Sequence, residues 1–185
     1  EPATRNREVL GSVHLWDQLK KKIGTYSGGM KPRIGIAQVL LHLPRSLVVD
    51  EPTAGLDPRE RIRFRNLLVE LSASRVVIFS THIIEDISSS CNTMAVINRG
   101  EVLFNGTPSQ MTEIAKGRVW KSSLPAEEFE EVTKEMLVVH HMRDGQHIRF
   151  RAISAEKPFD DSIAESPLLE DAYLWLLRND KEKQG

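Results

Sequence analysis

The sequence predicts an α/β fold, and its apolar patterns are the main reason. Residues 47–49 and 76–79 are short continuous apolar runs, which are typical of strands buried on both faces of a parallel sheet. Residues 59–72 place apolar side chains at helical spacing, so a helix packed on a core is expected there. The side chains expected in this core stripe are Ile62, Phe64, Leu67, Leu68 and Leu71.

The other elements are predicted from the same spacing rules and from turn residues. An amphipathic helix is expected between Val9 and Leu19, and another over residues 34–41. Met94 to Gly106 has the pattern of an antiparallel hairpin that turns at Arg99-Gly100. Further predictions are helices after His82 and over 109–115, a strand over 118–121, a helix over 125–136 with Phe129, Val132 and Met136 inward, strands over 137–141 and 147–153, and a helix over 168–177.

Length and composition narrow the class of protein. The 185 residues, 40% of them apolar, suffice for one domain with a core and a small second one. The net charge of −1 gives no reason to expect nucleic acid as a partner. The single cysteine, Cys91, excludes an internal disulfide framework and is expected to be a buried or half-buried apolar residue. Because no apolar run reaches the roughly 18 residues of a membrane span, we expect a soluble chain that meets a membrane only through a partner.

Two adjacent carboxylates, Asp50 and Glu51, follow the first predicted strand. In open α/β sheets, ligands bind beyond the carboxyl ends of the strands. Two acids at that place can divide the work, with Asp50 holding Mg²⁺ and Glu51 polarising the water that attacks a terminal phosphate. Taken alone, an acid pair after an apolar run is also the composition of a solvated strand end.

Three further segments are candidates for the same site. Ser27-Gly28-Gly29 places flexible backbone and a hydroxyl before a helix, where free N–H groups and the helix dipole favour an anion, although an ordinary loop has the same composition. Asp57-Pro58-Arg59-Glu60 has the residues of a helix start with Asp57 as its N-cap. Ser80-Thr81-His82 ends the second apolar run, so His82 lies beside Asp50 and Glu51 if the two strands are neighbours.

The order and spacing of these motifs resemble the ATP-binding subunit of ABC transporters, over about residues 8–110. The resemblance implies an α/β fold made of a partial RecA-like P-loop ATPase lobe with part of the ABC helical subdomain, plus a small C-terminal α+β extension. The implied parts are residues 1–45 with the signature motif, 46–116 as the catalytic lobe, and 117–185 as the extension. It assigns Ser27, Gly28 and Gly29 to the signature motif, Asp50 to the Walker B metal-binding aspartate, Glu51 to the catalytic glutamate, residues 54–57 with Asp57 to the D-loop, and His82 to the switch histidine.

The resemblance also implies cofactors and partners. ATP and Mg²⁺ are the expected cofactors, and ATP lies between two ATPase subunits of a homo- or heterodimer in the family. A transmembrane permease subunit is the expected partner, with the ATPase at the inner face of the cell membrane and export of the ABC-2 type as its task. Two alternatives stay open: a non-catalytic module that donates its signature face to a partner ATPase, and a soluble ABC-type ATPase of DNA repair or translation.

The sequence departs from the family pattern in two places. It contains no G-x-x-x-x-G-K-[ST] motif, the P-loop that cradles the β- and γ-phosphates. We therefore expect the 185 residues to be the carboxyl-terminal portion of a longer ATPase, inactive alone, with an unpaired apolar edge at residues 76–79. Pro32 stands where the family has a polar residue, and if Ser27 caps the helix, a bend is expected there. Lys31 and Arg33 flank the motif, either as solvated charges or as contacts to a ligand or partner.

Beyond Gly117 the pattern is more loosely similar to the extension of some ABC-2 type ATPases, including its closing L-E-D-A-Y-x-x-L-L segment at residues 169–177. His140, His141 and His147 are the only residues there that invite a metal interpretation. Because neighbouring strand residues point to opposite faces, surface histidines are the favoured interpretation. The extension is expected to mediate contacts with a second subunit or a partner.

Overall fold

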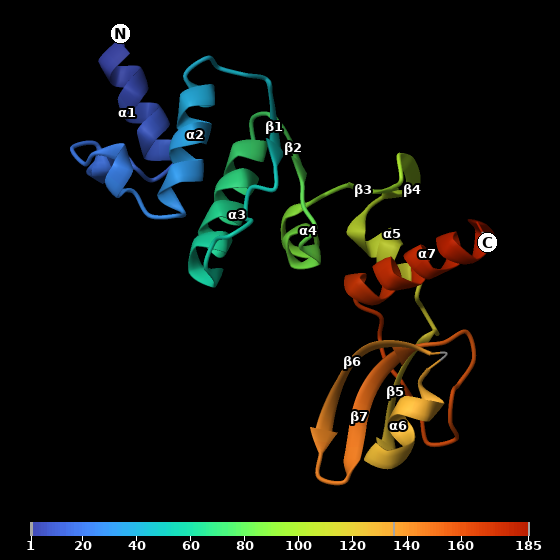
Figure 1. Ribbon diagram of the computed structural model, residues 1–185. Helices are drawn as coiled ribbons and strands as arrows, with labels where there is room; N and C mark the ends of the chain where they lie inside the picture. The colour runs from blue at the N-terminus through green and yellow to red at the C-terminus, as the bar shows by residue number, and fades with distance from the viewer. Residues whose placement is uncertain (1, 135, 185) are drawn as a thin grey trace. The chain divides into compact units, whose positions relative to one another are not determined.

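The computed structural model describes the backbone of residues 2–134 and 136–184, and the side chains of residues 4–134 and 136–180. Internal contacts divide the chain into two compact units that meet in sequence between Ser90 and Cys91. The elements of the first unit are α1 (Pro2–Ser12), two short 3₁₀ turns (Trp16–Gln18 and Ile23–Thr25), α2 (Met30–Leu40), β1 (Ser46–Asp50), α3 (Pro58–Ser72), β2 (Val76–Ser80) and α4 (Ile84–Ser90) (Figure 1).

The first unit is built around a parallel pair of strands with a helical connection. β1 and β2 run in register from Ser46 opposite Val76 to Asp50 opposite Ser80, and α3 makes the crossover between them, as parallel pairing requires. One face of the pair packs on a core that α1, α2 and α3 share. The buried members of that core are Val9, Val13, Leu15, Tyr26, Ile36, Ala37, Leu40, Leu47, Leu56, Phe64, Leu67, Leu68 and Leu71.

The prediction that both strands are buried on both faces is wrong. Val48 is 75% exposed, and Val76 and Ile78 are 57% and 55% exposed, all on the face opposite the core. The reason is that, among the described strands, β1 and β2 pair only with each other, and helices cover one face of this pair. For the same reason the outer side of β2 has no neighbouring strand among the residues that the structure describes, as expected for residues 76–79.

The helices of this unit differ from the prediction in three details. The helix expected between Val9 and Leu19 ends at Ser12, because His14 adopts a left-handed backbone with φ of 55°. That turn carries Val13 and Leu15 into the core, where they are 0% and 1% exposed. The helix expected over residues 34–41 begins earlier, at Met30. In α3 the predicted stripe is correct except for Ile62, which is 51% exposed.

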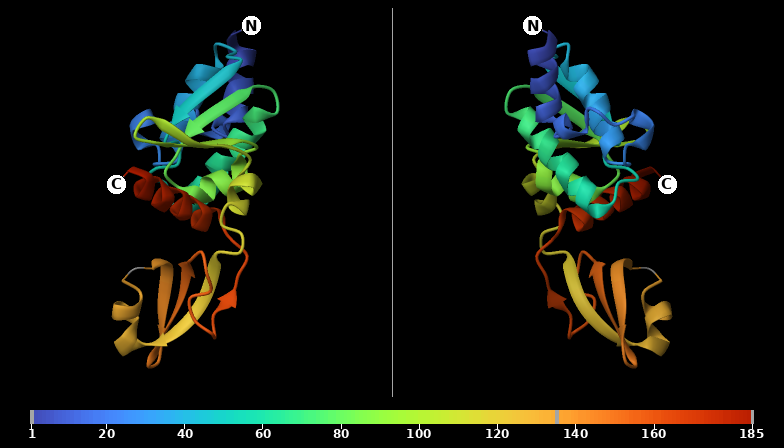
Figure 2. Two further views of the ribbon diagram at one scale, coloured as in Figure 1. Left: turned by 90° about the vertical axis from the view of Figure 1, so that its right-hand side faces the viewer. Right: turned by 90° about the vertical axis from the view of Figure 1, so that its left-hand side faces the viewer.

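The second unit begins with the predicted hairpin. β3 (Met94–Asn98) pairs antiparallel with β4 (Glu101–Gly106), and Arg99 and Gly100 form the turn with φ of 49° and 83°. Then follow α5 (Pro108–Glu113), β5 (Val119–Pro125), α6 (Ala126–Val132), β6 (Leu137–Asp144), β7 (His147–Ile153), β8 (Ile163–Ala164) and α7 (Leu169–Gln184). β5 to β8 form one antiparallel sheet in the order β6-β7-β5-β8 (Figure 2).

Helix α6 covers part of this sheet and makes its small core. Phe129 of α6 packs edge-on against Phe150 of β7, with ring centroids 5.4 Å apart. Met136 joins this cluster as predicted, whereas Val132 is 40% exposed because α6 ends there, four residues before the predicted end. The predicted helix over 168–177 is present and longer, because α7 continues to Gln184.

Candidate functional site

The carboxyl ends of β1 and β2 lie side by side. They bring together the acid pair Asp50-Glu51 and the segment Ser80-Thr81-His82. Asp50 and Ser80 are partners in the parallel register, and the Ser80 hydroxyl donates a hydrogen bond to the Asp50 carboxylate. The Glu51 N–H donates to the Ser80 carbonyl oxygen at 3.0 Å, which extends the strand pairing by one residue. The two strands are neighbours, which was the condition for His82 to lie beside the acid pair.

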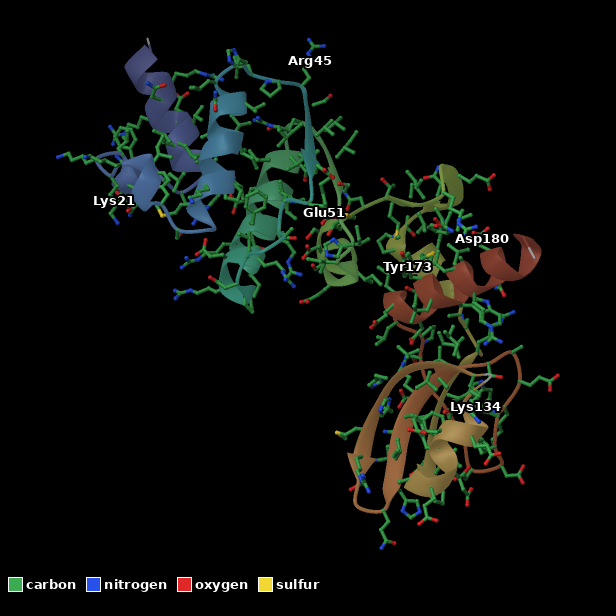
Figure 3. The ribbon with its side chains drawn as sticks, in the orientation of Figure 1. Lys21, Arg45, Glu51, Lys134, Tyr173 and Asp180 are labelled. Atoms are coloured by element: carbon green, nitrogen blue, oxygen red, sulfur yellow. The ribbon has the colours of Figure 1, made fainter. Side chains whose placement is uncertain are left out.

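Glu51 and His82 are in direct contact at this edge. His82 Nδ1 lies 2.8 Å from Glu51 Oε2, and the two side chains remain open to solvent, with 74% and 36% exposed. Glu51 has a left-handed backbone with φ of 46°, and Figure 3 shows it where β1 ends. The contact orients the imidazole ring through Nδ1, so that Nε2 can meet a substrate oxygen or a water.

The Ser27-Gly28-Gly29 segment differs from the prediction in how it begins its helix. Gly29, not Ser27, is the N-cap of α2, and it makes no side-chain cap. The Ser27 carbonyl accepts from the N–H groups of Met30 and Lys31 at 3.1 and 3.3 Å, which closes the segment into a tight turn. Ser27 and Gly28 are exposed while Gly29 is buried.

Pro32 lies in the first turn of α2. It is the third residue of α2, which runs from Met30 to Leu40 without interruption. Because the first N–H groups of a helix have few partners within it, a proline in the first turn is tolerated better than one in the helix interior. The predicted bend assumed Ser27 as the cap, whereas Gly29 is the N-cap, and the bend itself stays a prediction.

Asp57 caps α3, as the sequence predicted. Its Oδ1 accepts from the Glu60 N–H at 2.9 Å, and Pro58 occupies the first helical position. The Glu60 carboxylate, however, does not accept from the N–H of Asp57, as it would in a capping box. It instead binds two arginines, at 2.8 Å from Arg33 Nη2 and 2.6 Å from Arg63 Nη1.

Sequence reasoning missed the part played by Arg33. We expected a flanking charge, solvated or touching a ligand, but Arg33 is 7% exposed and bonded within the chain. Its Nε donates to the Gly29 carbonyl at 3.0 Å. The available signal was an arginine one helical turn after Gly29, because residues four apart lie on one helix face.

A second network fixes the turn between β1 and α3. Thr53 and Asp86 are 1% and 0% exposed, and the Thr53 hydroxyl donates to the Asp86 carboxylate. Arg65 Nη1 lies 3.4 Å from the other Asp86 oxygen. Asp86 therefore lies in the first turn of α4, where an acid complements the helix dipole, and it is also the buried acceptor of this network. Nothing in the sequence around Thr53 indicated that its hydroxyl would bind Asp86.

The donor atoms at the strand ends suit a magnesium nucleotide. Carboxylate oxygens from Asp50 and Glu51 are the ligands that Mg²⁺ prefers, and Mg²⁺ is usually held by one or two carboxylates together with substrate phosphates. In the described part of the chain, no group of three or more His, Cys, Asp or Glu side chains is placed to hold a metal ion. His140, His141 and His147 are exposed, and the His141 ring contacts Phe129 with centroids 5.0 Å apart.

Among the residues that the structure describes, no helix has the length and apolar character needed to cross a membrane. Cys91 is half-buried, as predicted.

Sequence comparison identifies relatives of known family. The family model described as "ABC transporter" matches residues 1–54. The uncharacterized ABC transporter ATP-binding protein YxlF of Bacillus subtilis is 37% identical over 117 residues, which are 63% of this chain and 40% of YxlF. The linearmycin resistance ATP-binding protein LnrL of Bacillus subtilis is 38% identical over 60% of this chain and 36% of LnrL. The bacitracin transport ATP-binding protein BcrA of Bacillus licheniformis is 41% identical over 52% of this chain and 32% of BcrA.

Solved structures support the same relationship. cbiO1 from Clostridium perfringens, described as part of the ABC transporter complex cbiONQ, aligns with a TM-score of 0.56 and 33% identity over 58% of this chain and 44% of its own. The ATP-binding cassette MJ1267 aligns with a TM-score of 0.54 at 23% identity, over 58% and 42%, and so supports the fold alone. The chain spans about two fifths or less of the length of these curated relatives.

Proposed function

We propose that this chain is part of an ATPase subunit that drives export through a membrane permease, because the family model of ABC transporters matches residues 1–54 and the similar proteins are ABC transporter ATP-binding proteins. The relatives named for linearmycin resistance and bacitracin transport support a transport role over DNA repair or translation. The division into residues 1–45, 46–116 and 117–185 belongs to this proposal.

The observation that carries the proposal is the contact between Glu51 and His82 at the shared edge of two parallel strands. Glu51 takes the proton of an attacking water, since an ionised carboxylate is an acceptor within reach of that edge. His82, held through Nδ1, directs its other ring nitrogen to the phosphate or the water. Positioning and charge stabilisation of this kind supply most of the catalysis in phosphoryl transfer.

The remaining candidate residues bind nucleotide in this proposal. Asp50, held by the Ser80 hydroxyl, supplies a carboxylate oxygen to Mg²⁺. Magnesium-bound ATP brings the reacting phosphate and the charge that neutralises its oxygens. Ser27, Gly28 and Gly29 present a hydroxyl and N–H groups to a phosphate, and Asp57 belongs to the same nucleotide-facing surface.

The partners proposed here are a transmembrane permease subunit and a second ATPase subunit, with no nucleic acid. The solved relative cbiO1 is described as part of a transporter complex, which supports a permease partner. The place of action is then the inner face of the cell membrane, reached through the permease.

Glu51→Gln tests the catalytic role. In the protein that contains this chain together with the rest of its ATP-binding domain, ATP binding should stay intact while turnover falls at least about tenfold, because the amide cannot accept the proton. The measurements are nucleotide binding by fluorescence and phosphate release. Glu70→Gln is the matched control, because that side chain is 61% exposed and outside the site.

Unchanged turnover in Glu51→Gln would remove Glu51 from the base role. Absence of hydrolysis in the unmodified protein, unless a partner ATPase is added, would support the non-catalytic module instead.

A further inference from the structure

We propose that Arg33 and Glu60 are positioning residues that lock the signature loop, residues 27–29, to the D-loop end of α3. The inference rests on the proposed function, since it concerns how two nucleotide-facing segments of one subunit are held together. It is drawn from contacts that neither the family match nor the relatives' names describe.

Arg33 makes the link from the signature loop. Its Nε donates to the Gly29 carbonyl at 3.0 Å, and its Nη2 donates to Glu60 Oε2 at 2.8 Å. A guanidinium presents several N–H donors in a fixed plane, so one side chain can hold a backbone carbonyl and a carboxylate at once. A lysine has one nitrogen and cannot reproduce this geometry.

Glu60 continues the link to Asp57. Its carboxylate binds Arg33, and its own N–H donates to Asp57 Oδ1 at 2.9 Å. Gly29, Arg33, Glu60 and Asp57 thus form one chain of hydrogen bonds, and both of its ends are residues predicted to face nucleotide. The side chains of Arg33 and Glu60 are only 9% and 13% exposed, so water screens their contact weakly.

Gly29 fits this contact because it has no side chain. A Cβ atom at Gly29 would lie 2.1 Å from Glu60 Oε2 and 2.8 Å from Glu60 Cδ, which are impossible separations. Arg33 and Arg63 hold the carboxylate from two sides, so it cannot simply turn away. The loop therefore rests directly on the Glu60 side chain.

Hydrogen exchange in the 185-residue chain without nucleotide tests the link. The amides of Met30 and Lys31 close the signature loop, and in Arg33→Met their exchange should be about tenfold faster, as expected for loss of a charge-assisted hydrogen bond. Arg33→Lys should show most of the same effect. Arg63→Met is the matched comparison: it removes the other partner of Glu60 without touching Gly29, and should change these amides by less than about twofold.

Equal acceleration at Met30 and at core amides of α3 would mean that Arg33 only supports global stability, and would overturn the proposal. So would equal effects of Arg33→Met and Arg63→Met.

A suppression experiment keeps the proposal testable if Arg33→Met does not fold. Gly29→Ala should lower the thermal unfolding midpoint of the chain, and Glu60→Ala in the same molecule should restore most of the loss, because the group that meets the new methyl is gone. Additive losses in the double variant would contradict direct contact.

The consequence for catalysis is measured in the protein that includes the rest of the ATP-binding domain. Arg33→Lys should raise KM for ATP about tenfold with kcat changed less than about twofold, the pattern of a lost binding interaction. Arg59→Lys, exposed in the same helical turn as Glu60, is the control. An equal fall of kcat in Arg33→Lys and Arg59→Lys would contradict a positioning role for Arg33. An unmodified protein without ATP hydrolysis would count against the proposed function, while the exchange result would stand separately.

Discussion

Glu51 holds its carboxylate at the strand edge with an unfavourable backbone. Its φ of 46° lies in the left-handed region, which costs a residue with a side chain roughly 1–2 kcal/mol. Two backbone hydrogen bonds fix the conformation, from the Glu51 N–H to Ser80 and from the Ala54 N–H to the Glu51 carbonyl. Strain of this kind is typical of functional positions, where the surrounding structure imposes it.

Replacing Glu51 by asparagine should therefore stabilise the chain. Asparagine tolerates the left-handed region, so Glu51→Asn should raise the free energy of unfolding by up to about 1 kcal/mol. Glu51→Gln keeps the length and the strain and should leave stability nearly unchanged. Urea unfolding followed by circular dichroism measures both, and a loss of stability in Glu51→Asn alone would show that the His82 contact outweighs the strain.

At the scale of elements, the positions and ends of the first two strands could be predicted from the sequence, whereas the exposure of their faces could not. The apolar runs placed β1 and β2 to within a residue or two, and the acids after β1 marked the site edge, because side-chain type at a strand end is local information. Val48 and Ile78 have the same composition as buried strand residues, but their burial depends on what covers the sheet.

Long-range ion pairs were the other part that local patterns could not predict. Arg33 and Glu60 are 27 residues apart, and Arg65 and Asp86 are 21 apart. From the sequence alone, a charged residue in a helix can be interpreted either as exposed to solvent or as buried in an ion pair. Only the packing of α2 and α4 against α3 decides between them.

The link between β7 and α7 is a buried ion pair of the same kind. Arg151 donates to Asp171 through Nε at 3.1 Å and Nη2 at 2.7 Å, and Nη2 also reaches the Ser166 carbonyl at 2.8 Å. The Glu165 carboxylate accepts from Nη1. The side chains of Arg151 and Asp171 are 8% and 0% exposed. The closing segment at 169–177 thus predicted a helix, but not that Asp171 anchors it to the sheet.

Arg151→Met should destabilise the second unit by about 3 kcal/mol, because it leaves Asp171 buried without its partner. The hydrogen bond with Asp171 raises the pKa of the Arg151 guanidinium. A raised pKa stabilises the fold below the unfolded pKa, and this contribution is lost only as the pH rises through the folded value. The difference between Arg151→Met and the unmodified chain should hence stay constant from pH 7 to about pH 10 in urea titrations. A difference that shrinks within that range would contradict the assignment.

At the scale of the whole chain, the two units have separate cores, and the candidate site lies in the first of them. Every candidate site residue, from Ser27 to His82, lies in the first unit, as does the family match over residues 1–54. The second unit has its own aromatic cluster around Phe129 and Phe150 and its own buried ion pair. A compact unit with an internal core is the kind of segment that folds as a domain.

Residues 91–185 expressed alone should therefore fold. We expect cooperative thermal unfolding and a near-ultraviolet circular dichroism signal from Trp120 and Trp175, which contact Ser154 and Arg118 within this unit. The same segment carrying Arg151→Met is the control for a weakened core. A gradual, non-cooperative transition in the unmodified segment would contradict an independent domain.

The close approach of Gly29 to Glu60 also restricts how this sequence can change over evolutionary time. Any side chain gained at position 29 while Glu60 is present meets its carboxylate at once. The reverse order is open, since a smaller residue at position 60 removes the obstacle first. The order of substitutions is thus constrained. Which residues position 29 can accept depends on which residue already stands at position 60, which is 31 positions further along the chain.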